Sequence, residues 1–143
     1  MRKYVYALFL VCGIVSLPAH ADVASAQKLA DKYASIAKNI DPNFKGLSAD
    51  AGRAFYIKEI TLHGKSGKVS CSSCHTDNPA GQGEDVNTHK KIKSLAPAID
   101  PKRFSDINKV EKNFEKHCLD IIGRDCTAQE KGDYITYLLT IKK

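Results

Sequence analysis

The sequence predicts an all-α fold, and three observations support this. Apolar residues recur at three- and four-residue steps over several long segments, which is the period of an amphipathic helix. No segment shows the alternation of apolar and polar residues that is typical of a strand, and no internal repeat is visible. Capping residues, glycine and proline bound the periodic segments. With 143 residues, of which 43% are hydrophobic, the chain is long enough to bury one core.

The expected helices can be placed in order along the chain. They cover residues 22 to about 40, 48 to about 60, 105 to 122 and 127 to about 141. Ser48 is the expected N-cap of the second helix, and Gly123 is a C-terminal stop for the third. Thr127 and Glu130 have the spacing of a capping box, which predicts that the last helix begins there.

The most informative stretch is Cys71-Ser72-Ser73-Cys74-His75. Cysteines three positions apart share one helical turn, so each thiol can form a thioether with a haem vinyl group, and the next residue lies beneath the iron. A zinc ribbon would need a second closely spaced cysteine pair, which the chain lacks, and a redox dithiol would need a βαβ setting instead of the flanking loops. We therefore predict one covalently bound haem c, attached to Cys71 and Cys74, with His75 as the proximal iron ligand.

The beginning of the chain has the pattern of an export signal. Two basic residues precede an apolar run from Tyr4 to Leu17, and Ala19-His20-Ala21 is a small-residue cleavage site. This predicts a signal peptide over residues 1–21. A lipoprotein cysteine at Cys12 is the less favoured alternative, because Val11 is bulkier than the residue expected before it.

The rest of the chain is expected to be periplasmic, with a helix and linker over residues 22–47 and the haem domain over residues 48–143. No further apolar run reaches the length of a membrane span, so no transmembrane segment is expected in the mature chain. Removal of Arg2 and Lys3 with the signal peptide leaves 20 basic and 16 acidic residues, and this formal +4 favours acidic protein partners. Nucleic acid is not an expected partner, because no dense arginine cluster with interleaved aromatic residues is present.

The iron ligand opposite His75 can be narrowed by composition. The only methionine is Met1, in the predicted signal peptide, so a His/Met ligand pair is excluded. His63, His89, His117, a lysine, an asparagine or an open position remain. His117 is favoured because it lies on the apolar stripe of the helix over residues 105–122, although a histidine there can also be a satisfied core residue.

Cys118 follows this histidine, and we expect it to form a disulfide with Cys126 in an oxidising compartment. Two free thiols are the alternative. The loop is short, so the chain-entropy model gives only about 2.5 kcal/mol of stabilisation. The bridge would also restrict the backbone beside His117 and limit how far its imidazole can swing.

These residues together resemble the class I cytochrome c fold: an early helix with Gly52 and Phe55/Tyr56, one haem-attachment motif, and an aromatic last helix. The chain is more closely similar to the sphaeroides haem protein family of monohaem c-type cytochromes. The shared motifs are Cys71-Ser72-Ser73-Cys74-His75-Thr76, Thr88-x-Lys90-x-Ile92, Leu95-Ala96-Pro97, Arg103-Phe104, Lys109-Val110-Glu111-Lys112, and Ile122-Gly123-Arg124-Asp125-Cys126-Thr127 with Glu130-Lys131. The resemblance implies class I cytochrome c-like helices around one haem, with an extra amino-terminal helix. Separately, the run from Asn87 to Ala98 offers hydroxyl and ammonium donors for haem propionates, and Thr88, Lys90, Pro97 and Arg103 are the expected haem contacts.

Proteins of that family have a sixth iron ligand directly before the first disulfide cysteine, and the resemblance implies the same position here. This ligand is typically asparagine, which leaves the iron on reduction so that oxygen or another small ligand can bind. The present chain has His117 there, and imidazole binds haem iron far better than an amide does. His89 stands where the family tends to have glycine, and Ser94 replaces a usual proline.

The sequence therefore predicts a periplasmic electron carrier, more plausibly than an enzyme, with His75 and His117 bound to iron in both oxidation states. Its partners, as the resemblance implies, are a dihaem c-type cytochrome and a b-type membrane cytochrome. The alternative is a haem protein that binds oxygen or nitric oxide after His117 dissociates on reduction.

Overall fold

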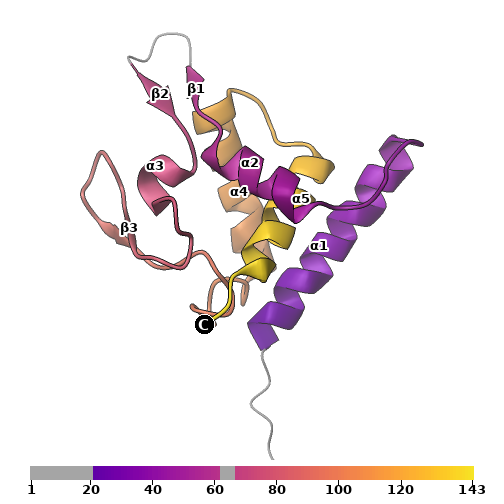
Figure 1. Cartoon of the computed structure of the whole chain (residues 1–143), viewed down its shortest axis with the longest axis horizontal. Helices are drawn as coiled ribbons and strands as arrows, with labels where there is room; N and C mark the ends of the chain where they lie inside the picture. The colour runs from indigo at the N-terminus through magenta and orange to yellow at the C-terminus, as the bar shows by residue number, and fades with distance from the viewer. Residues whose placement is uncertain (1–20, 62–66) are drawn as a thin grey trace, which may run out of the picture.

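The computed structural model describes residues 21–61 and 67–143, which form helices and four very short strands (Figure 1). The helices are α1 (Ala21–Ile40), α2 (Ala49–Ile57), α3 (Ser72–His75), α4 (Ile107–Ile122) and α5 (Ala128–Thr140). Two antiparallel ladders pair β1 (Ile60–Thr61) with β2 (Lys68–Val69) and β3 (Gly83–Glu84) with β4 (Lys91–Ile92). The predicted signal peptide, except Ala21, and the candidate ligand His63 lie outside the described residues.

The ends of the helices follow from local chemistry. The Ser48 side chain accepts a hydrogen bond from the Ala51 amide, and Thr127 and Glu130 form the reciprocal bonds of a capping box. Gly123 ends α4 with φ of 79°, in the left-handed region that favours glycine. The second helix is shorter than predicted because Ile60 and Thr61 pair with β2. Two-residue strands carry no readable periodicity, so the ladders were not predictable.

The core forms around α5, which packs against both α1 and α2. Figure 1 shows α1 running diagonally along one side of the other helices. Each helix contributes an apolar stripe, as its sequence period predicted. The buried side chains that these three helices contribute to the core are Ala26, Leu29, Ala30 and Tyr33 of α1, Tyr56 of α2, and Ile135, Tyr137 and Leu138 of α5. No helix among the described residues is both long and apolar enough to cross a membrane.

Two glycines allow close packing between α5 and its neighbours. A Cβ placed on Gly52 of α2 would lie 1.9 Å from the backbone oxygen of Asp133 in α5. A Cβ on Gly132 would lie 2.6 Å from Cδ2 of Leu47. The backbones of α2 and α5 therefore touch, and this contact places α2 beside the haem-attachment motif.

A buried carboxylate holds the linker between α1 and α2 against α5. Oδ1 of Asp133 accepts a hydrogen bond of 2.7 Å from the Ser48 amide. Gln129 donates to both carboxylate oxygens and to the Gly46 carbonyl. The polar atoms of the linker are therefore satisfied where it enters the core, as buried polar groups require.

We predict that Gly52→Ala destabilises the protein by about 1–3 kcal/mol, because the new methyl group meets a helix backbone that cannot move aside cheaply. Urea denaturation followed by circular dichroism measures this loss. Ala51→Ser, at an exposed position of the same helix, is the matched control. Equal stability of the two variants would contradict the close crossing.

Candidate haem site

A cavity of about 290 Å³ lies between the attachment motif, α4, α5 and the segment around residues 92–104. Most of its lining is apolar, which suits the flat hydrocarbon surface of a porphyrin. The apolar lining includes Phe55, Ile92, Leu95, Phe104, Phe114 and Leu138. The polar and thiol groups that face it come from Cys71, His75, Arg103, Asn113, His117 and Tyr134.

The motif forms α3, a helix of only four residues. The buried Ser70 begins it: the Ser70 amide donates to the Ser73 hydroxyl at 3.0 Å, and the Ser73 amide donates to the Ser70 hydroxyl at 3.2 Å. Cys71 and Cys74 are both free thiols, and Cys71 lines the cavity. Burial raises the pKa of the Cys71 thiol to about 11. Neither thiol takes part in a disulfide, which agrees with the thioether bonds that the motif predicts.

His75 and His117 face one another across the cavity, with ring centroids 6.5 Å apart and ring planes inclined by 54°. An imidazole nitrogen binds a metal at about 2 Å, so two imidazoles on one metal have centroids roughly 6 Å apart. The observed separation fits an iron ion between the rings. The structure thus brings together the two histidines that the sequence singled out.

Both imidazoles are held in the neutral form that a metal ligand needs. Burial, followed by the charges of His117 and Arg103, lowers the pKa of His75 to about 4. His117 is exposed at the edge of the cavity, yet its partial burial and the neighbouring Lys116 lower its pKa as well. Their nitrogen lone pairs are free to bind iron at neutral pH.

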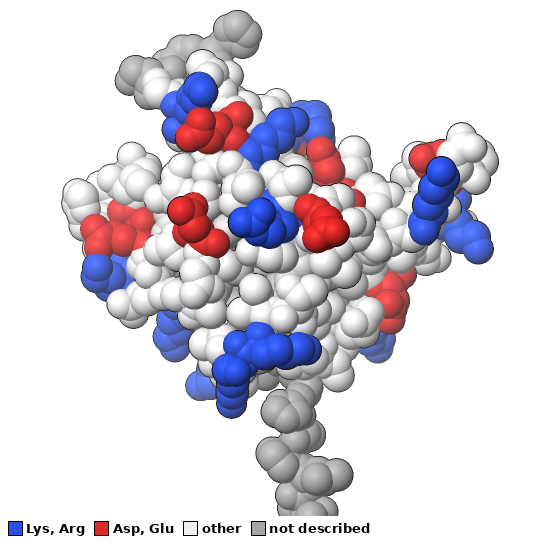
Figure 2. Space-filling model, in the orientation of Figure 1, with Lys and Arg blue, Asp and Glu red and all other residues white. Residues whose placement is uncertain are grey.

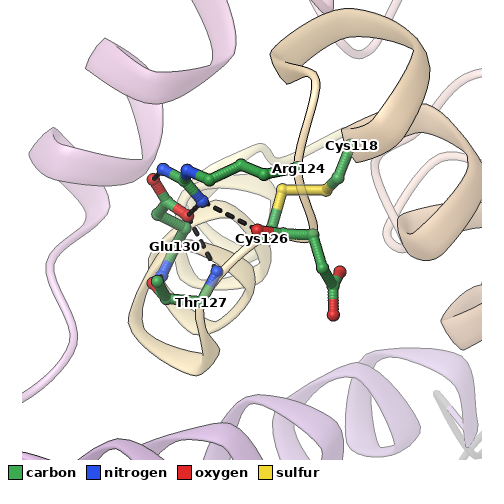
Figure 3. A network of polar contacts seen from close by, with 6 residues as sticks. Cys118, Arg124, Cys126, Thr127 and Glu130 are labelled. Atoms are coloured by element: carbon green, nitrogen blue, oxygen red, sulfur yellow. Dashed lines mark hydrogen bonds and ion pairs between the residues drawn. A yellow bond between two sulfur atoms is a disulfide. The ribbon is translucent and has the colours of Figure 1, made fainter.

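The end of α4 that carries His117 is tied to the start of α5 by a disulfide and an ion pair (Figure 3). Cys118 and Cys126 are bridged, with Cα atoms 5.6 Å apart. Both guanidinium nitrogens of Arg124 donate to the Glu130 carboxylate, at 2.8 and 2.6 Å. Glu130 also accepts from the Thr127 amide at 2.8 Å. The loop after His117 is therefore held both by the disulfide and by the hydrogen bonds and ion pair of Glu130.

Arg103 lines the cavity with its side chain fixed by backbone oxygens. Its Nε donates to the Ser94 carbonyl at 2.9 Å, and a terminal nitrogen donates to the Lys93 carbonyl at 2.5 Å. The Ser94 hydroxyl is itself buried, donating to the Pro79 carbonyl and accepting from the Ala96 amide. Arg103 is thus a pre-positioned cation beside the cavity, suited to a haem carboxylate.

The other predicted haem contacts do not line the cavity. Thr88 and Lys90 are exposed on the connection between β3 and β4, where the Thr88 amide donates to Asp85. Pro97 is buried but is not among the lining residues. Asn113 and Tyr134 do line it and were not predicted as site residues. Asn113 lies three residues after Val110 and four before His117, so its helical spacing was a usable signal.

His89 is turned away from the iron position. It is exposed, and its Nδ1 lies 3.0 Å from Oε1 of Glu84. Its φ of 57° lies in the left-handed region, which costs non-glycine residues about 1–2 kcal/mol. This explains why glycine suits the position, and it removes His89 from the candidate ligands that the described structure supports.

We predict that His89→Gly raises stability by about 0.5–1 kcal/mol, because relief of the left-handed strain outweighs the extra chain entropy of glycine. Loss of the exposed Glu84 contact costs little. His89→Ala is the control, since it loses the contact but keeps the strain. Thermal unfolding measures the difference; an alanine variant as stable as the glycine variant would contradict this account.

A helical domain with one haem-attachment motif, opening on an apolar cavity between two facing imidazoles, defines a monohaem c-type cytochrome. Comparison with known proteins supports this class. The chain belongs to the family described as "Domain of unknown function (DUF1924)", whose model matches residues 42–138. It is homologous to cytochrome c'' and to the sphaeroides haem protein, SHP.

The sequence relatives match over almost their whole length. The chain is 44% identical to cytochrome c'' of Methylophilus methylotrophus over 142 residues, which is 99% of this chain and 96% of that protein. It is 35% identical to the cytochrome c-type protein SHP of Cereibacter sphaeroides over 130 residues, which is 90% of this chain and 94% of that protein. The predicted family is thereby confirmed, and with it one haem c as the cofactor.

The fold also resembles those of solved structures. The crystal structure of oxidised cytochrome c'' from Methylophilus methylotrophus superimposes with a TM-score of 0.78 at 46% identity, covering 85% of this chain and 98% of that one. The structure of oxidised SHP, described as an oxygen binding cytochrome c, gives a TM-score of 0.70 at 34% identity, covering 81% and 96%. The all-α, cytochrome-like fold is confirmed. The roles of individual site residues stay predictions.

Proposed function

We propose that this protein is a periplasmic electron carrier whose haem is attached to Cys71 and Cys74 and held between the imidazoles of His75 and His117. The observation that carries the proposal is the 6.5 Å separation of the two imidazole centroids across an apolar cavity. That separation matches a metal ion bound on both sides. An iron whose sixth coordination position is always open would not need a second imidazole facing the first.

The protein's own groups suit electron transfer. The bound haem supplies one-electron exchange between ferric and ferrous iron. His75 and His117 would hold the iron in both oxidation states, so that little would have to move when an electron arrives. The sequence has no methionine outside position 1, so the potential is expected to be lower than that of His/Met cytochromes.

Partners follow from charge and from the resemblance to the family. Without the predicted signal peptide the 20 basic and 16 acidic residues give a formal net charge of +4, which favours an acidic redox protein, and a dihaem c-type cytochrome or a b-type membrane cytochrome is the partner we propose. Figure 2 shows basic and acidic side chains interspersed over one face, with neither sign covering it. On that face, docking would depend on local contacts more than on the long-range electrostatic attraction of a surface with one sign of charge.

We predict that the ferric wild type has the low-spin spectrum of a haem with two histidine ligands, and that His117→Ala loses it, because the alanine side chain has no atom to bind iron. Electron paramagnetic resonance and visible spectra measure this. His89→Gly is the control and should keep the wild-type spectrum. An unchanged spectrum in His117→Ala would reject the proposed ligand pair.

Two observations favour a second function, in which His117 dissociates from the iron on reduction and a small molecule binds in its place. His117 lies exposed at the cavity edge, whereas His75 is half-buried. The solution structure of cytochrome c'' from Methylophilus methylotrophus is described as giving insights into the structural basis of haem-ligand detachment. Its TM-score is 0.77 at 43% identity, with 85% of this chain and 98% of that one covered.

We predict that carbon monoxide separates the two functions when it is added to the reduced wild type. The electron carrier, with both ligands retained, should bind it only slowly and at a rate independent of its concentration, because His117 must leave first. A fast reaction that grows with carbon monoxide concentration would establish the second function. His117→Ala is the reference for an open iron. Stopped-flow absorbance gives both rates.

A further inference from the structure

We propose that Tyr56 is a positioning residue for the proximal iron ligand, holding the backbone of His75 and Thr76 through its buried hydroxyl group. The inference rests on the proposed role of His75 in the preceding subsection. It adds a residue of α2, outside the attachment motif, to the machinery that sets the iron's environment.

The need for such a residue follows from the length of α3. A helix of four residues is far below the length at which helices are stable alone, and its last carbonyl groups have no partner within the helix. Thr76 then turns the chain away with φ of 62° and ψ of 166°, which prevents the helix from continuing. The carbonyls at its carboxyl end must find a donor elsewhere in the fold.

Tyr56 supplies that donor. Its hydroxyl lies 3.1 Å from the His75 carbonyl oxygen and closer still to that of Thr76, so one proton is shared between the two acceptors. The side chain is 0% exposed. The hydrogen bond is therefore shielded from water.

The tyrosine ring is itself immobilised by α5. Its centroid lies 6.1 Å from that of Tyr134 and 5.7 Å from that of Tyr137. The close crossing at Gly52 fixes α2 one turn earlier. Tyr56 thus links the packed contact of α2 and α5 to the backbone that carries the proximal imidazole, and restrains that backbone.

A second element closes on the same backbone. A Cβ placed on Gly83 of β3 would lie 2.2 Å from the Cys74 carbonyl oxygen and 3.0 Å from the His75 Cα. The residues around His75 are therefore held by the Tyr56 hydroxyl and by the backbone of β3. Thioether bonds would fix Cys71 and Cys74 but leave the peptide after His75 free to rotate, so the hydroxyl has a separate task.

We predict that Tyr56→Phe, in the haem-loaded protein, raises the reduction potential and broadens the ferric paramagnetic resonance signal. A loosely held imidazole binds iron less well, and ferric iron, which carries the higher charge, loses more than ferrous iron does. Redox titration and the ferric spectrum measure these two effects. Neither follows from a loss of stability alone.

Tyr137→Phe is the matched control, because it removes a hydroxyl from a tyrosine packed against Tyr56 for which the described structure gives no bond to the motif. If the two variants have the same potential and the same ferric spectrum as wild type, the proposal is wrong. Should Tyr56→Phe give too little folded protein, the wild type decides: nuclear magnetic resonance of the ferrous form must show a slowly exchanging Tyr56 hydroxyl proton near the His75 carbonyl. Its absence also overturns the proposal.

The experiments distinguish a failure of the proposed function from a failure of the proposed role of Tyr56. If the wild-type spectrum shows that His75 does not bind iron, the proposed function fails first. If that spectrum shows two histidine ligands but Tyr56→Phe leaves the potential unchanged, only the positioning role of Tyr56 is lost.

Discussion

The proximal histidine is carried by a helix too short to be stable alone, and the surrounding structure compensates for this. Ser70 begins α3, the Tyr56 hydroxyl accommodates its last carbonyls, and β3 packs over it at Gly83. Ser70 and Gly83 lie close to the motif in sequence, whereas Tyr56 belongs to α2, so its contact forms only once α2 has docked on α5. The close crossing of α2 and α5 at Gly52 is therefore as important to the site as the motif itself.

The opposite side of the cavity is built differently. His117 belongs to a long, stable helix, and its position depends on how the end of α4 is anchored. The disulfide from Cys118 and the pairing of Arg124 with Glu130 restrain that end, while the imidazole itself stays at the exposed edge of the cavity. Whether the protein carries electrons or releases His117 depends on the strength of that anchoring against the strength of the iron–imidazole bond.

Two departures from the related family also acquire physical reasons. His89 occupies a left-handed backbone position, where glycine would be unstrained, and it compensates in part by contacting Glu84. Ser94 replaces a proline with a hydroxyl that bonds to the Pro79 carbonyl and the Ala96 amide. The Ser94 carbonyl accepts a hydrogen bond from Arg103, which faces the cavity. The hydroxyl thus joins residue 94 to Pro79 and Ala96, whereas the bond to Arg103 uses a backbone carbonyl that proline would also have.

The sequence by itself determined the helices, their caps at Ser48, Thr127 and Gly123, and the attachment motif, because these depend on neighbours within a few residues along the chain. It also singled out His117, through its place on an apolar helical stripe. Only the tertiary structure decided that His117 faces His75, that Thr88 and Lys90 lie away from the cavity, and that Tyr56 reaches the motif. Such relations join side chains from separate elements, and their distances are set by helix packing, which leaves no periodic pattern in the sequence.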